Sequence, residues 1–64
     1  MNQPVYTVPD FCAAHSISRA LFYLLMRDGR APAVMKVGRR TLVSAEAAAT
    51  WRKRMETDTL KRAA

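Results

Sequence analysis

Polar and cationic side chains in residues 18–27 have the types and spacing needed to contact a polyanion such as nucleic acid. Ser18 is placed to cap a helix, whose first turn can then face a phosphate or a base edge. Arg19 can donate two hydrogen bonds to a guanine in a major groove, which discriminates against other bases by about 1–3 kcal/mol. Ala20 allows close approach, Tyr23 offers a hydroxyl to phosphate, and Arg27 suits the phosphate backbone. The same residues could alternatively form an ordinary solvated face, with Tyr23 packed partly inward.

A second cationic cluster lies at residues 36–40, which read Lys-Val-Gly-Arg-Arg. Gly38 at the first position of a two-residue loop favours a type II′ hairpin turn. Lys36, Arg39 and Arg40 would then project together from the tip, able to follow a phosphate strand or enter a narrow minor groove. The alternative is a hairpin whose charges only prevent edge-to-edge aggregation.

Other chemistry has little support in the sequence. Cys12 is the single cysteine and is expected to be a small buried residue. His15 is expected to be a turn residue, with a contact to phosphate as the alternative. Neither has partners at the spacing of a metal site or a catalytic triad. The run 52–54 is expected to be a solvated face rather than a binding surface. We therefore expect no enzyme activity, no cofactor and no metal.

The composition is consistent with one small basic domain. The 64 residues include 11 Lys and Arg against 5 Asp and Glu, which gives a formal net charge of +6. That excess suits a polyanionic partner, of which nucleic acid is the commonest. Half of the residues are hydrophobic, enough for a compact core. No apolar run spans a bilayer and no secretory signal is evident, so we expect a cytoplasmic protein without a membrane partner.

The first half of the chain predicts an extended arm at residues 1–6, followed by a helix–turn–helix. Thr7 is the expected N-cap of a helix at residues 8–14, with Pro9 in its first turn. Ser18 is expected to cap a second helix at residues 19–27, which ends before Gly29. Five apolar side chains should form one buried stripe along and before this helix: Ile17, Leu21, Phe22, Leu25 and Met26.

The second half predicts a two-stranded wing and a third helix. Strands are expected at residues 34–37 and 40–43, followed by a helix capped by Ser44 in which Ala47, Trp51 and Met55 share the buried face. The folded domain is expected to cover residues 7–56, with a basic tail at residues 57–64 that frays. The fold class is mainly α with a small β-hairpin, in a winged helix-turn-helix arrangement.

These features resemble the AlpA-like and excisionase-like DNA-binding domains, small relatives of the MerR-type winged helix-turn-helix. The resemblance rests on residues 16–20 (Ser-Ile-Ser-Arg-Ala), Gly29, Pro32, residues 36–40, Leu42, Ser44 and Trp51, and covers about residues 5–55. Two positions depart from the family pattern. Ser16 stands where glycine is frequent, so a left-handed backbone there would be strained. Leu24 stands where a polar residue is frequent and could contact a protein, including a second copy.

The resemblance implies a phage, prophage or mobile-element protein that binds DNA as a transcriptional regulator or as a recombination directionality factor (an excisionase). Such a protein would be associated with the nucleoid of a bacterium or with phage DNA. In this family the start of the second helix reads the major groove, a role that falls here on Ser18, Arg19, Ala20 and Tyr23. The wing at residues 36–40 would reach the minor groove or backbone. Self-association or cooperative binding on repeated sites is also expected. The alternative is a protein-interaction module that docks on an integrase or a polymerase subunit.

Overall fold

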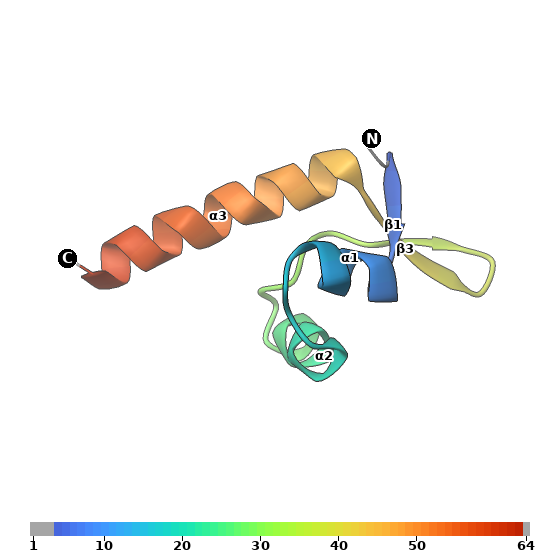
Figure 1. The fold of residues 1–64 in the computed structure, drawn as a ribbon, viewed down its shortest axis with the longest axis horizontal. Coiled ribbons are helices and arrows are strands. Elements are labelled where there is room, and N and C mark those ends of the chain that lie inside the picture. The colour runs from blue at the N-terminus through green and yellow to red at the C-terminus, as the bar shows by residue number, and fades with distance from the viewer. Residues whose placement is uncertain (1–3, 64) are drawn as a thin grey trace.

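The computed structural model describes residues 4–63 as three helices and a three-stranded antiparallel sheet, a mixed α/β fold (Figure 1). The elements are, in order, β1 (Val5–Thr7), α1 (Val8–Ala14), α2 (Arg19–Arg27), β2 (Met35–Val37), β3 (Arg40–Ser44) and α3 (Ala45–Ala63). The three helices and the hairpin expected from the sequence are therefore present. The third strand was not expected.

Each helix begins at a hydroxyl side chain that satisfies a free backbone amide. The Oγ1 atom of Thr7 accepts from the amide of Asp10 at 3.2 Å, and Ser18 Oγ accepts from the amide of Leu21 at 3.0 Å. Ser44 does the same for the third helix, accepting from Ala47 at 3.0 Å. Such caps stabilise a helix by about 0.5–2 kcal/mol and fix where it starts. All three predicted N-caps are confirmed.

Three tight turns require a left-handed backbone. Gly29 follows α2 with φ 71°, and Gly38 opens the hairpin turn with φ 62°. Both are residues without a Cβ, for which this conformation costs little. Ser16 adopts φ 58° between α1 and α2. For a residue with a Cβ this is a strained position.

The sheet has the order β1-β3-β2, so the segment before the first helix pairs with the strand that precedes the last. Tyr6 pairs with Val43, and Lys36 pairs with Thr41 across the hairpin. The amide of Ala45 also donates to the carbonyl of Pro4 at 2.9 Å. Residues 5 and 6 of the expected extended arm are extended, and main-chain hydrogen bonds hold them to β3. Residues 1–3 of that arm lie outside the described part of the chain.

The core forms where α1, α2, β3 and α3 meet around Phe11. The Phe11 ring is fully buried and packs edge-on against Tyr6, Phe22 and Trp51, with centroid distances of 6.0, 5.6 and 5.2 Å. The other buried residues of this core cluster are Val8, Cys12, Phe22, Val43, Ala48 and Trp51. Cys12 is buried as expected, and the predicted face of α3 with Ala47, Trp51 and Met55 packs on the core. The stripe on α2 is narrower than expected, because only Phe22 is buried while Leu21 and Met26 are 40% and 37% exposed.

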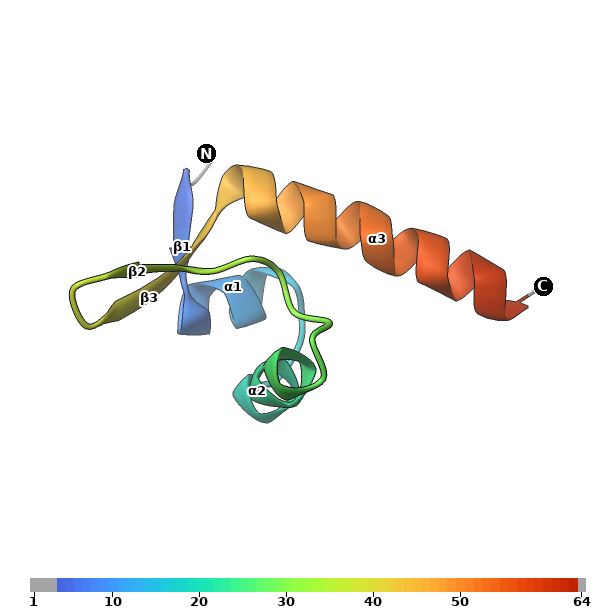
Figure 2. The same ribbon diagram turned by 180° about the vertical axis from the view of Figure 1, so that it is seen from behind.

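The third helix continues to Ala63, so the tail expected to fray from residue 57 is helical as far as the structure describes it. No residue of α3 after Met55 is buried within the described range. In Figures 1 and 2 the second half of this helix projects beyond α1 and α2. Its C-terminal end and the hairpin lie at opposite ends of the molecule. The molecule is accordingly elongated, with principal extents of 41 × 27 × 17 Å.

Candidate nucleic-acid interface

The start of α2 presents its polar residues to solvent. Arg19, Ala20 and Tyr23 are exposed, and the Tyr23 ring is 51% accessible. Tyr23 packs edge-on against the buried Phe22 with a centroid distance of 5.5 Å, which supports one side of its ring. Ser18 Oγ accepts a hydrogen bond from the amide of Leu21, so its hydroxyl hydrogen is still free to donate to another acceptor. These side chains are therefore available for contact, and none is needed to close the core.

Arg27, at the other end of α2, lies in a different electrostatic setting. Its Nε atom is 3.5 Å from the Asp28 carboxylate, and both side chains are well exposed. A surface pair of this kind contributes little to stability. The Asp28 carboxylate does partly neutralise the positive charge of the Arg27 guanidinium, and an anionic ligand would have to displace it. Among the candidate residues of α2, Arg19 therefore carries the less compensated charge.

The hairpin holds the second group of candidates. Lys36 extends across to β3, where its Nζ donates to Thr41 Oγ1 at 2.7 Å. In the turn, Gly38 has a positive φ and Arg39 does not, which is the pattern of the predicted type II′ turn. A Cβ built on Gly38 meets nothing within 4 Å, so the tip is open. Arg39 and Arg40 are exposed beside it.

A groove of about 410 Å³ joins the two groups. Tyr23 of α2 lines one side of it, and Arg39 and Arg40 of the hairpin line another; Thr7, Val8, Pro9 and Thr41 complete its lining. The described lining thus contains two guanidinium groups and no carboxylate. Of the predicted site residues, the groove brings together Tyr23, Arg39 and Arg40. Ser18, Arg19, Ala20, Arg27, Lys36 and Gly38 lie outside it.

Thr41 was missed at the sequence level, although a signal for it existed. A two-residue Gly38–Arg39 loop pairs Val37 with Arg40 and hence Lys36 with Thr41, which is the observed register. Thr41 lies two positions before the buried Val43 in β3 and so shares its face of the sheet. Its hydroxyl holds the Lys36 ammonium group, and its position in the groove follows from that register.

His15 is a packing residue. Its ring stacks on Phe11 with a centroid distance of 4.1 Å, and its Nδ1 atom lies 2.8 Å from the Phe11 carbonyl oxygen. A carbonyl only accepts, so Nδ1 donates; Nε2 then accepts from Arg52 Nη1 at 2.9 Å. Arg54 likewise donates to the Ala31 carbonyl at 3.0 Å. The run at residues 52–54 therefore includes two contacts that attach α3 to the body, which no local sequence pattern could reveal.

Cys12 is buried in the core, as expected from the sequence. Burial raises the pKa of the Cys12 thiol, and the positive charge of Arg19 opposes that shift. Removing the thiol from water disfavours the thiolate more than Arg19 favours it. Cys12 is therefore a packing residue whose ionisation would disturb the core beneath the start of α2.

Two further observations concern other kinds of site. Within residues 4–63, no three His, Cys, Asp or Glu side chains gather closely enough to hold a metal ion. In the same range, none of the helices has the length and hydropathy of a membrane span.

Comparisons with protein-family models, with curated proteins and with solved structures found no match to this chain.

Proposed function

We propose that the protein is a sequence-specific DNA-binding protein of the winged helix-turn-helix type, which acts without catalysis. The first turns of α2 would enter the major groove, and the β2–β3 hairpin would lie on the adjacent minor groove or backbone. The observation that carries this proposal is the shared groove, in which Tyr23 of the helix faces the same space as Arg39 and Arg40 of the hairpin. One duplex could thus be contacted by both elements at once.

The residues of α2 would make two kinds of contact, with base edges and with phosphates. The exposed Arg19 would make a bidentate contact with guanine, and the small Ala20 would let the helix approach the base edges. Ser18 and Tyr23 would donate their hydroxyls to phosphates, which fix the register of the protein without reading sequence. Arg27 would reach a backbone phosphate only after releasing Asp28.

The wing would act as a cationic clamp. Lys36, Arg39 and Arg40 project from a short, well-paired hairpin, and the bond from Lys36 to Thr41 positions one of these charges in advance. Contacts of this kind strengthen binding to every sequence and make it dependent on salt. The wing supplies affinity and the helix supplies specificity.

The resemblance to AlpA-like and excisionase-like domains extends the proposal to a biological role, in a phage or mobile element, as a transcriptional regulator or a recombination directionality factor. A single module of this size covers only about 600–1,000 Å² of its own surface on DNA. Several copies on neighbouring sites would therefore act together, and such an array can bend DNA. Bending assists recombination, whereas occupancy beside a promoter regulates transcription.

The experiment that tests this proposal selects bound duplexes from a randomised pool and compares three variants. Arg19→Ala should flatten the selected sequence preference, whereas Arg39→Ala should weaken binding to all sequences about equally. Arg62→Ala removes the same charge from the far end of α3 and serves as the matched control (Figure 1). A pool from which the wild-type protein selects no sequence would contradict the proposal, as would equal losses for Arg19→Ala and Arg62→Ala.

A protein-interaction module is the second candidate, favoured by apolar exposure on α2. Leu21, Leu24 and Met26 are 40%, 43% and 37% exposed, more than a helix with one buried stripe requires. In this alternative α2 would dock on an integrase or a polymerase subunit. It predicts that Leu24→Ser abolishes capture of that subunit by the protein, while affinity for DNA is negligible in both forms.

A further inference from the structure

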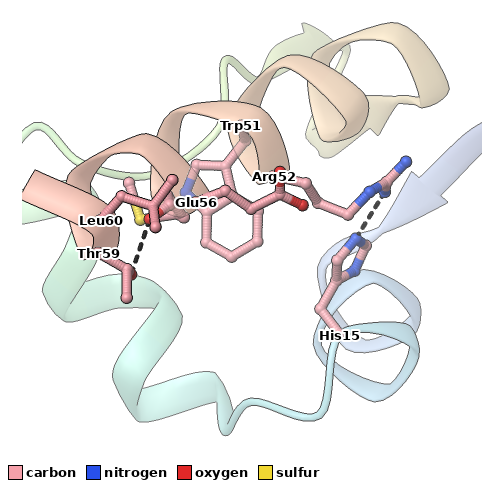
Figure 3. Close-up of a pocket in the computed structure, with 7 residues that line it drawn as sticks. His15, Trp51, Arg52, Glu56, Thr59 and Leu60 are labelled. Carbon is pink, nitrogen blue, oxygen red and sulfur yellow. Dashed lines mark hydrogen bonds between the residues drawn. The ribbon is translucent and has the colours of Figure 1, made fainter. Parts of the chain in front are cut away.

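One face of α3 lines a groove that no segment of this chain within residues 4–63 fills. The groove has a volume of about 630 Å³ and lies where the second half of α3 passes the end of α1, as Figure 3 shows. His15 closes one end of it. Its remaining lining repeats at helical spacing along two turns and a half: Trp51, Arg52, Met55, Glu56, Thr59 and Leu60.

This face of α3 exposes apolar side chains to solvent. Leu60 is 71% exposed, the most exposed large hydrophobic residue of the described chain, and it lies in line with the half-buried Met55 and the buried Trp51. The Thr59 hydroxyl donates to the Met55 carbonyl at 2.8 Å, so it does not require water in the groove. A single exposed leucine is ordinary, but one at the end of a continuous apolar groove is a candidate contact.

The charges on the same face are self-complementary. Arg52 and Glu56 are four residues apart, yet in the described structure the one salt bridge joins Arg27 to Asp28. Arg52 instead donates to His15. If a second α3 lies antiparallel in the groove, Arg52 of each copy comes close to Glu56 of the other. A two-fold axis makes this contact twice, as an isologous interface requires.

We propose that this groove binds α3 of a second copy of the protein, antiparallel to the first. Leu60 of each copy would pack at the level of Trp51 and His15 of the other, with Met55 near the two-fold axis. The contact spans fewer turns than a standard interface of about 1,200–2,000 Å² needs, so the free protein forms a weak dimer. The second half of α3, which is not buried against its own body, would be stabilised in that dimer.

The dimer does not depend on the proposed DNA-binding function, and it is measured without DNA. Sedimentation equilibrium on the full chain should show a reversible monomer–dimer equilibrium. Leu60→Ser should leave only monomer at concentrations where the wild-type protein is mostly dimer. Because Leu60 is so exposed, this change cannot remove core packing, and unchanged helical circular dichroism would confirm that the variant is folded.

Leu24→Ser is the matched control, since Leu24 is an exposed leucine on a different helix. It should leave the dimer intact. A wild-type protein that stays monomeric at every concentration would overturn the proposal. Dissociation by Leu24→Ser with Leu60→Ser still dimeric would also overturn it, because the interface would then lie on α2.

A charge exchange tests the antiparallel geometry itself. Arg52→Glu opposes two carboxylates at each contact, and Glu56→Arg opposes two guanidinium groups, so each variant should dimerise roughly tenfold more weakly than the wild-type protein. An equal mixture of the two should recover dimer, because every contact between unlike copies is then attractive. A mixture no more associated than its components would contradict this arrangement.

Discussion

Replacement of Trp51 by alanine should unfold most of the protein, because this side chain connects α3 to the rest of the core. The indole is 8% exposed and packs against Phe11 with a centroid distance of 5.2 Å. Its Nε1 atom donates to the Arg30 carbonyl at 2.8 Å, which ties α3 to the segment before β2. Removing a buried tryptophan costs about 3–5 kcal/mol, and the lost hydrogen bond adds about 0.5–1.5 kcal/mol.

That loss is large compared with the stability available. A domain of this length has a free energy of unfolding of about 3–10 kcal/mol. Urea denaturation followed by circular dichroism should therefore show Trp51→Ala largely unfolded without denaturant, or with a midpoint close to zero. Trp51→Phe keeps an aromatic ring but loses the bond to Arg30, so it should lose only about 1–2 kcal/mol.

Lys53→Ala is the surface control on the same helix and should change stability by less than about 0.5 kcal/mol. A Trp51→Ala variant with the stability of Lys53→Ala would refute the reasoning. It would mean that α3 is not packed on Phe11, and that the core of this fold has been assigned to the wrong residues.

Two further predictions concern the backbone and the buried thiol. Ser16→Gly should raise the melting temperature by roughly 2–8 °C, because relief of the positive φ outweighs the added chain flexibility; an unchanged or lower value in a thermal melt would show that Ser16 is not strained. Burial raises the pKa of the Cys12 thiol, so the folded state retains the proton to higher pH than the unfolded chain. Cys12 therefore contributes stability below the ordinary thiol pKa of about 8.5 and loses it as the pH rises through the folded value. Denaturation at several pH values should show a steeper alkaline decline for the wild-type protein than for Cys12→Ala, and equal slopes would refute this.

Local signals were sufficient for the helix starts and the turns. Thr7, Ser18 and Ser44 cap helices through bonds to residues three positions away, so the whole interaction lies within one stretch of sequence. Gly38 likewise determines a turn, and through it the Lys36–Thr41 register. Interactions of this range leave a readable pattern.

The missed features depend on distant partners or on weak patterns. Strand β1 forms because Val5 pairs with Ser44, and a three-residue strand has too short a pattern to predict alone. The contact of His15 with Arg52 joins residues 37 positions apart. The second half of α3 buries no side chain against the rest of the protein. The expected core therefore gave no reason to predict that this segment is helical. The residues of this segment form a recognisable helix face only as the lining of the groove beside Leu60.

The salt dependence of DNA affinity tests the central proposal most directly. Phosphate contacts from Arg27, Lys36, Arg39 and Arg40 would release about four counterions, which predicts a log–log slope of about −4. Between roughly 50 and 300 mM salt the affinity for a selected duplex should then fall by about 10³-fold, and Arg39→Ala should reduce the slope by about one. An affinity that does not change over this range would contradict the proposal that these side chains bind the phosphate backbone.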